Sequence, residues 1–243
     1  MRFSMHIPHK HFDDFADLND FFWVPPDVSW KGIGSHYREA AREKEVWLDD
    51  GTYYGVQLSS NRSWETLFEE LVKAAEKINA THIVIPDGGE EDFAGMSTFY
   101  TTKGVDWLKA RGLSLKTIGV WRGFEKDLAR LQHITDVVVL PHHRPRNRYV
   151  TRATASRFHY GGFRTFSELE AALPLSIDTD APVAAAVEGC DLQNSCRRAS
   201  LAPMSFDVKL SSEEIVAARR LAILIKETKA APQNKTISGG HYV

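Results

Sequence analysis

Eight short apolar runs, separated by longer amphipathic or polar segments, constrain this chain more than any other feature. The runs span residues 2–7, 21–24, 46–49, 82–87, 115–121, 137–142, 156–161 and 175–178. They are rich in Val, Ile and aromatic residues and apolar on both faces, which is typical of strands in a buried parallel sheet. Eight such strands alternating with helices predict an α/β fold, a single (β/α)8 TIM-type barrel. The segments after the second and sixth runs are irregular, so an open doubly wound sheet is the alternative.

Helical signals fill several segments between the runs. Apolar residues recur at helical spacing over 63–79, behind a serine that can cap the helix. A shorter helix is expected over 165–173, again behind a capping Ser or Thr. Over 211–230 acidic residues come first and basic residues last, as the dipole of a helix favours.

The length of the chain fits one barrel. Such a barrel typically takes about 250 residues, and this chain has 243. We therefore expect three parts, which are a barrel over 1–210, a C-terminal helix packed on it over 211–230, and a mobile tail over 231–243.

Composition excludes several classes of protein. No stretch approaches roughly 20 consecutive apolar residues, so no membrane span is expected. The N-terminal residues lack the apolar run and small-residue cleavage site of a secretory signal. Cys190 and Cys196 are too few for a disulfide framework or a four-thiolate zinc site, and they fit a reducing cytoplasm. The net charge of −2 gives no global basic field, so any nucleic-acid signal must be local.

Polar residues gather where the runs end, which is where barrel enzymes place their catalytic groups. These strand-end residues are His6, His9, Asp49, Asp50, Asp87, Arg122, His142, His143, His159 and Asp178. A carboxylate that directly follows a buried strand must find hydrogen-bond donors or a ligand. The alternative is local, because Asp-Gly pairs form turns and Asp178 can cap the helix that follows it.

Paired carboxylates at one end of a barrel are the usual apparatus for breaking a glycosidic bond. One of them attacks or stabilises the sugar, and the other moves a proton. The strand-end histidines favour a rival, a metal-dependent barrel hydrolase built on His9, His11, His142, His159 and Asp178. His11 is followed by the start of a helix, so surface or capping roles are the simpler interpretation of these histidines.

The segment from Val137 to Ser167 contains no acidic residue but six arginines. The arginines that we expect to contact phosphates are Arg144, Arg146, Arg148, Arg152 and Arg157. Aromatic residues interleave with them, as suits phosphates and an unstacked base. The alternative is a solvated loop whose arginines pair with acidic residues elsewhere in the fold.

Six motifs, in this order, resemble the tRNA-guanine transglycosylase superfamily. They are "SMHIPHKH", "WLDDGTYYG", "IVIPDGG", "IGVWRG", "RFHYGG" and "SIDTDAP", and they run from about Phe3 to Pro182. The resemblance is closest to the short phage-type members that insert 7-deazaguanines into DNA. It implies a modified (β/α)8 barrel that exchanges guanine for a 7-deazaguanine through a covalent glycosyl-enzyme.

The resemblance assigns two catalytic residues. Asp178 matches the last-strand aspartate that acts as nucleophile, and Asp49 matches an acid that moves a proton during base exchange. It also assigns residues that bind the base. Asp87 matches the acid that reads the guanine edge, while Gly161 and Gly162, with His159 in the same motif, match a glycine pair that lets backbone approach the base. Arg122 stands where the family usually has a Gln, so the incoming base is in doubt.

The resemblance implies a pentosyltransferase that replaces guanine in DNA with a 7-deazaguanine such as 7-cyano-7-deazaguanine. DNA and the deazaguanine base are its expected partners, and action on tRNA is the alternative. The family's zinc motif is absent, which favours the compact DNA-modifying type and implies no metal and no other cofactor. A cytoplasmic location is expected, which is the host cytoplasm for a phage-encoded member.

Overall fold

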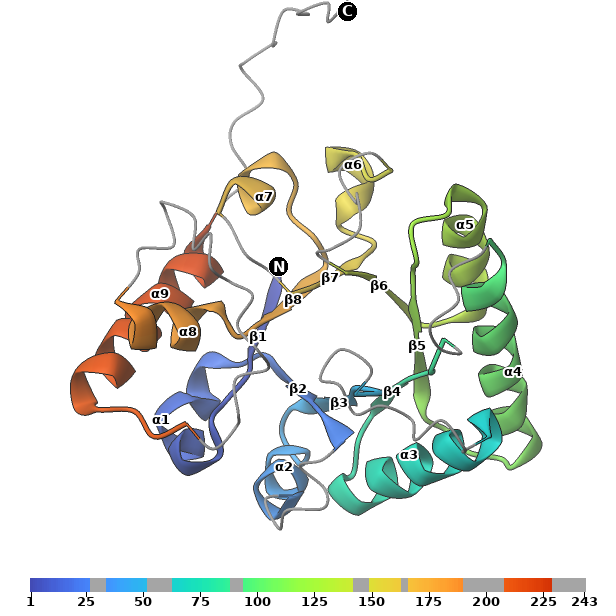
Figure 1. Ribbon diagram of the computed structural model, residues 1–243, viewed down its shortest axis with the longest axis horizontal. Coiled ribbons are helices and arrows are strands. Elements are labelled where there is room, and N and C mark those ends of the chain that lie inside the picture. Colours follow the sequence, from blue (N-terminus) through green and yellow to red (C-terminus); the bar gives the residue numbers. More distant parts are fainter. Residues whose placement is uncertain are drawn as a thin grey trace, which may run out of the picture.

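The chain folds into an eight-stranded parallel β/α barrel, as predicted (Figure 1). The computed structural model describes residues 1–26, 34–51, 63–87, 94–141, 149–162, 166–189 and 208–228. The strands are β1 (Arg2–Met5), β2 (Phe21–Val24), β3 (Glu45–Leu48), β4 (His82–Val84), β5 (Lys116–Val120), β6 (Val137–Pro141), β7 (His159–Gly161) and β8 (Ser176–Thr179). The helices are η1 (His9–His11), α1 (Phe12–Phe15), η2 (Ala16–Leu18), α2 (Gly34–Ala40), α3 (Trp64–Ile78), α4 (Met96–Ala110), α5 (Glu125–Ile134), α6 (Arg152–Ala155), α7 (Phe166–Ala171), α8 (Ala181–Glu188) and α9 (Ser212–Glu227). The doubly wound alternative is excluded, because the strands form a ring with the helices outside it.

The ring has one seam, between β1 and β2. The hydrogen-bonded order of the sheet is β1-β8-β7-β6-β5-β4-β3-β2, so β1 pairs along its length with β8. On the other side of β1, Asn19 Oδ1 accepts from the Met5 N–H at 2.7 Å, and Asn19 Nδ2 donates to the Met5 carbonyl at 3.0 Å. The Trp23 backbone N–H donates to Ser4 Oγ at 2.9 Å. The Asn19 side chain therefore satisfies the backbone of Met5 in β1, and the Ser4 side chain satisfies the backbone N–H of Trp23 in β2. One backbone bond also lies at the seam, from the Asp20 N–H to the Phe3 carbonyl at 2.8 Å.

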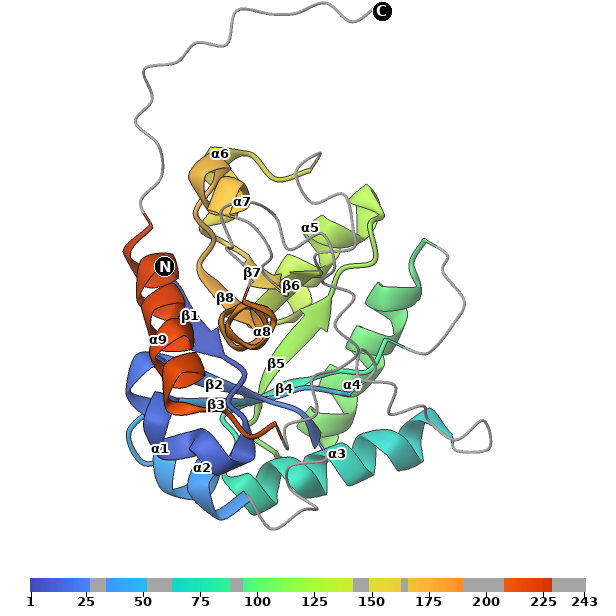
Figure 2. The same cartoon turned by 60° about the vertical axis from the view of Figure 1, so that its left-hand side comes forward.

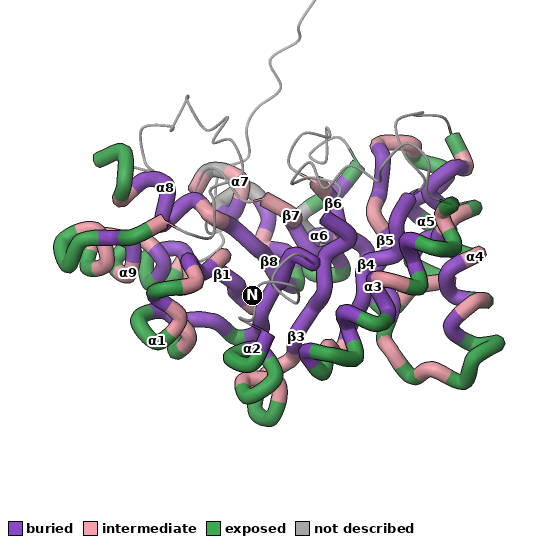
Figure 3. Tube along the Cα trace, turned by 60° about the horizontal axis from the view of Figure 1, so that its bottom comes forward, coloured by how far each residue is buried: buried purple, intermediate pink, exposed green. Residues whose placement is uncertain are grey.

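Alternation along each strand decides what faces the interior of the barrel. Ile177 of β8 belongs to the core between the sheet and the helices, so its neighbours Ser176 and Asp178 point inward. Large aromatic residues fill the interior beside aliphatic ones. This inner cluster consists of Phe21, Trp23, Trp47, Val84, Ile118, Val137 and Val139. Figure 3 shows the strands buried and the outer faces of the helices exposed.

An ion-pair layer lies at the amino ends of the strands. Arg2 Nη1 lies 2.7 Å from Glu45 Oε2, and Lys116 Nζ lies 3.7 Å from Glu45 Oε1. The guanidinium of Arg2 also stacks over the ring of Phe21, 5.0 Å from its centroid. Burial lowers the pKa of the neighbouring His82 to about 4, so this histidine is neutral at physiological pH.

Local signals set the helix boundaries. Ser63 caps α3 by accepting from the Thr66 N–H at 3.2 Å. At α9, Ser211 accepts from the Glu214 N–H at 3.3 Å, and Glu214 Oε2 accepts from the Ser211 N–H at 2.7 Å. In the described part of the irregular segment before β7, which starts at residue 149, the helix is the four-residue α6.

Helix α9 packs on the barrel beside α8 and β1 (Figure 2). Ala218, Ala222 and Ile225 are its buried side, and Arg219 forms a bidentate pair with Asp17. The tail over 231–243 lies outside the described residues. Within the described ranges, no helix is long and apolar enough to cross a membrane.

Candidate active site

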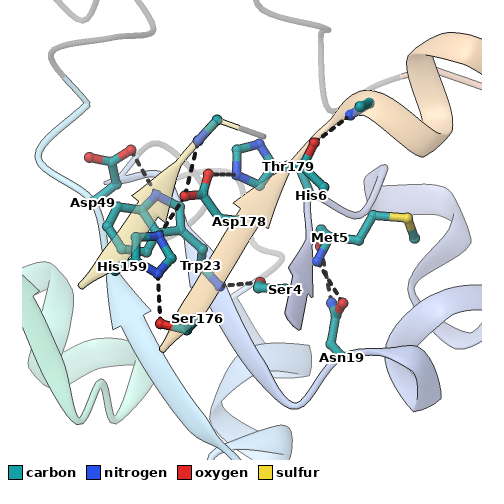
Figure 4. Close-up of polar contacts among 12 residues, drawn as sticks. Ser4, Met5, His6, Asn19, Trp23, Asp49, His159, Ser176, Asp178 and Thr179 are labelled. Atoms are coloured by element: carbon teal, nitrogen blue, oxygen red, sulfur yellow. Dashed lines mark hydrogen bonds and ion pairs between the residues drawn. The ribbon is translucent and has the colours of Figure 1, made fainter. Parts of the chain in front are cut away.

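Asp178 is the centre of a polar cluster at the carboxyl ends of the strands (Figure 4). His159 Nε2 of β7 lies 2.7 Å from Asp178 Oδ1, and His6 Nε2, just after β1, lies 3.1 Å from Asp178 Oδ2. The Gly162 N–H adds a longer contact of 3.4 Å to Oδ1. Because an ionised carboxylate only accepts, both imidazoles donate to it. Asp178 is therefore held between a histidine just after the first strand and a histidine of the seventh.

Burial alone would oppose the charge on Asp178, but the surrounding donors outweigh it. Hydrogen bonds from His159 and His6 lower the pKa of Asp178 far below its usual range. Burial likewise works against a charge on His6, yet the hydrogen bond and charge of Asp178 raise the pKa of His6 above its ordinary value. The His6–Asp178 pair thus favours an imidazolium beside a carboxylate.

His159 is fixed on every side. Its Nδ1 lies 2.9 Å from Ser176 Oγ, its side chain has no exposed surface, and its ring stacks on Trp23 with centroids 4.8 Å apart and planes 3° apart. Since Nε2 donates to Asp178, a neutral His159 accepts from the Ser176 hydroxyl. Beside it, a Cβ on Gly161 would lie 2.9 Å from Val139 Cγ1, so this close approach requires glycine.

Asp49 lies opposite Asp178, directly after β3. Its Oδ2 accepts from Trp23 Nε1 at 3.0 Å, and its Oδ1 accepts from the Asp50 N–H at 2.7 Å. Burial raises the pKa of Asp49; the two donors oppose that rise, and the charge of Asp178 adds to it. The two carboxyl groups therefore have pKa values displaced in opposite directions, which is how active sites separate the roles of two acids.

Asp87 and Arg122 form a separate pair after β4 and β5. Arg122 Nε donates to Asp87 Oδ2 and Arg122 Nη2 to Asp87 Oδ1, both at 2.6 Å, and both side chains are buried. This fork-on-fork arrangement directs both carboxylate oxygens at a guanidinium. The resemblance implies that Asp87 accepts from the donor edge of a guanine, whereas here both of its oxygens accept from Arg122.

The expected arginine surface is only partly described. Arg144, Arg146 and Arg148 lie outside the described residues, and so do His142, His143, Cys190 and Cys196. Arg152 begins α6, and Arg157 is exposed just before β7, whereas the Asp178 cluster lies at the opposite ends of the strands. Nucleic acid as a partner of this segment stays a prediction.

Among the described residues, His9, His11, His159 and Asp178 do not assemble the predicted metal site, and His142 lies outside those residues. His11 is bonded through Nδ1 to Asp14 and through Nε2 to the Leu210 N–H, both at 2.9 Å, which ties it to α1 and the start of α9. Among the residues that the structure describes, no group of three or more His, Cys, Asp or Glu side chains could hold a metal ion. That the chain needs no cofactor stays a prediction.

Two members of the cluster were given no role from the sequence. His6 was one strand-end histidine among several, and Trp23 read only as part of an apolar run. Period-two alternation along a barrel strand, which turns every second side chain inward, is the signal that could have identified them.

Fold and site together define a (β/α)8 barrel with a histidine–carboxylate cluster at the carboxyl ends of its strands. No protein-family model matches the chain, and no curated protein is significantly similar to it. Among solved structures, 3-hexulose-6-phosphate synthase from Salmonella typhimurium aligns with TM-score 0.52 and 10% identity, over 93% of this chain and 99% of that one. A tryptophan synthase structure from Pyrococcus furiosus aligns with TM-score 0.51 and 10% identity, over 93% and 96% of the two chains. A D-tagatose 3-epimerase-like protein aligns with TM-score 0.51 and 9% identity, over 93% and 97%. At these identities the comparisons show the fold alone.

These comparisons correct the interpretation drawn from the six motifs. The three barrels named above are two synthases and an epimerase-like protein, so the resemblance to tRNA-guanine transglycosylases is wrong. Insertion of 7-deazaguanine into DNA, action on tRNA and the phage-type assignment depended on that resemblance and are wrong too. The metal-dependent hydrolase also lacks support. The physical reason is that each motif is an apolar run followed by polar residues, a pattern that barrels of unrelated function share. The arrangement of Asp87 against Arg122, described above, agrees with this correction.

Proposed function

We propose that the chain is an enzyme that isomerises or epimerises a small polyhydroxy carbonyl compound by proton transfer. The observation that carries this proposal is that Asp49 and the hydrogen-bonded His6–Asp178 pair lie together at the carboxyl ends of the strands. The His6–Asp178 pair favours a bound proton, and Asp49 has a raised pKa. A carboxyl group with a raised pKa and an imidazole that favours its protonated form can accept and donate protons efficiently.

Each group has a defined role in the proposed reaction. Asp49, when ionised, removes a proton from the carbon next to the substrate carbonyl. Asp178 favours the charged form of the His6 imidazole before the reaction. The imidazolium then gives a proton to the carbonyl oxygen, which forms a neutral enediol. In isomerisation, Asp49 returns its proton to the neighbouring carbon, while the neutral His6 takes a proton from the hydroxyl of the carbon that was deprotonated, which becomes the new carbonyl. In epimerisation, His6 takes its proton back from the original oxygen, the same carbon gains a proton from solvent on its other face, and Asp49 releases its proton to solvent.

The solved barrels with similar folds support this class of chemistry without assigning a substrate. Structures of D-psicose 3-epimerase and of a D-tagatose 3-epimerase-like protein align with TM-scores of 0.50 and 0.51. Those activities belong to those proteins. For this chain the argument rests on the cluster, because one barrel fold hosts many unrelated reactions.

Proton exchange with solvent tests the proposal directly. The full chain is incubated in D2O with a panel of free and phosphorylated ketoses and aldoses, and NMR follows the loss of carbon-bound hydrogen. We expect exchange with at least one member, and Asp49→Asn should reduce its rate by about 10²–10⁴-fold. Asp106→Asn, the same chemical change on the exposed face of α4, is the matched control and should leave the rate unchanged.

Two results would overturn the proposal. One is the absence of exchange across the whole panel, and the other is equal exchange by the Asp49 variant and the wild type. Carbon–carbon cleavage products without exchange would assign the site to aldol-type chemistry instead.

A further inference from the structure

Trp23 contacts both halves of the candidate site, although it has no acid or base of its own. Its indole Nε1 donates to Asp49 Oδ2 at 3.0 Å, and its ring lies flat on His159 at 4.8 Å between centroids. His159 in turn donates to Asp178 Oδ1 at 2.7 Å. One rigid side chain thus connects the carboxyl after β3 to the carboxylate on β8 (Figure 4).

The position of Trp23 is itself fixed. Its backbone N–H donates to Ser4 Oγ at 2.9 Å, the residue is 7% exposed, and its ring packs near that of Trp47 at 6.0 Å between centroids. An indole has a single N–H and cannot accept, so its hydrogen bond to Asp49 has only one possible direction. Movement of the ring would therefore break the Asp49 hydrogen bond and the His159 stack together.

We infer that Trp23 is a positioning residue that holds the Asp49 carboxyl and the His159–Asp178 pair in one fixed relative geometry. This inference rests on the proposed function for its catalytic meaning, but its physical content is independent of any substrate. It also explains why an aromatic residue with a polar edge occupies this inward position, where a barrel more often places an aliphatic one.

The Asp49 environment defines what a test must separate. Its charged or titratable neighbours are Asp178 of β8, His6 after β1 and Asp50, while Trp23 supplies an uncharged donor. Trp23→Phe keeps a ring against His159 and removes only that donor. Since a hydrogen bond to a carboxylate stabilises its charged form, the titration midpoint of Asp49 should rise by about one pH unit or more.

The barrel contains a matched control. Trp47 also contacts His159, at 5.5 Å between centroids, but its indole donates to Glu45 Oε2 at 3.2 Å at the other end of the barrel. Trp47→Phe therefore makes the same chemical change in the same core. It should leave the Asp49 midpoint where it is in the wild type.

Carboxyl-carbon NMR of the full chain, with labelled aspartate, measures these midpoints, and the Asp49 signal is assigned by its loss in Asp49→Asn. An unchanged Asp49 midpoint in Trp23→Phe, or an equal shift in Trp47→Phe, refutes the inference. Should Trp23→Phe fail to fold, the wild type suffices, because the Trp23 indole N–H signal must titrate with the Asp49 midpoint and the Trp47 signal must not. Both NMR measurements need no substrate, so they are independent of the proton-exchange assay. A shifted Asp49 midpoint without proton exchange would refute the proposed function alone. Proton exchange without a shifted midpoint would refute this inference alone.

Discussion

Replacing Asp178 with Asn removes the charge at the centre of the cluster while keeping the size of the side chain. The carboxylate accepts from His159 at 2.7 Å and from His6 at 3.1 Å. An amide offers a single acceptor oxygen, so one of the two histidines must face the NH2 group and change its tautomer or lose its hydrogen bond.

The magnitude follows from those two contacts. Hydrogen bonds to charged groups contribute about 1.5–3 kcal/mol each and neutral ones about 1 kcal/mol. Replacing two charged hydrogen bonds with one neutral one should therefore cost about 2–5 kcal/mol of unfolding free energy. The loss should depend on pH. His6 has a raised folded pKa, so its contribution is fully present below about pH 6.5 and is lost as pH rises through the folded pKa. Asp178 has a lowered folded pKa, so its contribution is present above about pH 3.9 and is lost as pH falls through the folded pKa.

Urea unfolding, followed by the fluorescence of the six tryptophans, measures the difference between wild type and Asp178→Asn at each pH. We expect the largest difference between about pH 4 and pH 6.5 and a smaller one near pH 9. The Asp106→Asn control should show little difference at any pH. A difference for Asp178→Asn that stays constant with pH, or grows toward alkaline pH, would refute the assignment of charge to this pair.

Three further outcomes can be measured by the same unfolding assay. Asn19→Ala leaves a buried backbone N–H and C=O of β1 without their side-chain partner and should cost about 2–4 kcal/mol. Asp87→Asn removes the charge partner of the buried Arg122 guanidinium and should cost about 3 kcal/mol, whereas Asp17→Asn, at an arginine pair on the surface, should cost less than about 1 kcal/mol. Because the folded pKa of His82 is about 4, wild-type stability should fall as pH drops from about 6.5 toward 4, and His82→Gln should remove that part of the pH dependence.

Much of the fold follows from local patterns. The bounds of all eight strands lie within one or two residues of the expected runs, except that β4 and β7 are shorter. Short apolar runs between helices form buried strands in a parallel barrel, so their positions could be predicted. The serines before α3 and α9 cap those helices as expected. The short α6 lies within the segment after the sixth run, in which apolar residues do not recur at helical spacing.

The candidate site was predictable only in part. Asp49 and Asp178 could be expected to share one end of the barrel, since every strand ends there. The Asp87–Arg122 pair and the role of His6 depend on side-chain contacts between strands, which a linear pattern does not encode. The six motifs misled for a related reason, because they report how strands end and not what the side chains after them contact.

The seam between the first two strands has a consequence for how the protein is made. Asn19 can fasten β1 to the second strand as soon as the first two dozen residues exist, because its partner Met5 is only 14 residues away. His6, however, meets Asp178 across 172 residues of sequence, and β1 gains its ladder only when β8 arrives. The ladder of β1 therefore has no partner until residues 176–179 have been made, and long-range closure of this kind is slow. The histidine–carboxylate cluster forms in that last step, so its appearance reports that the barrel has closed.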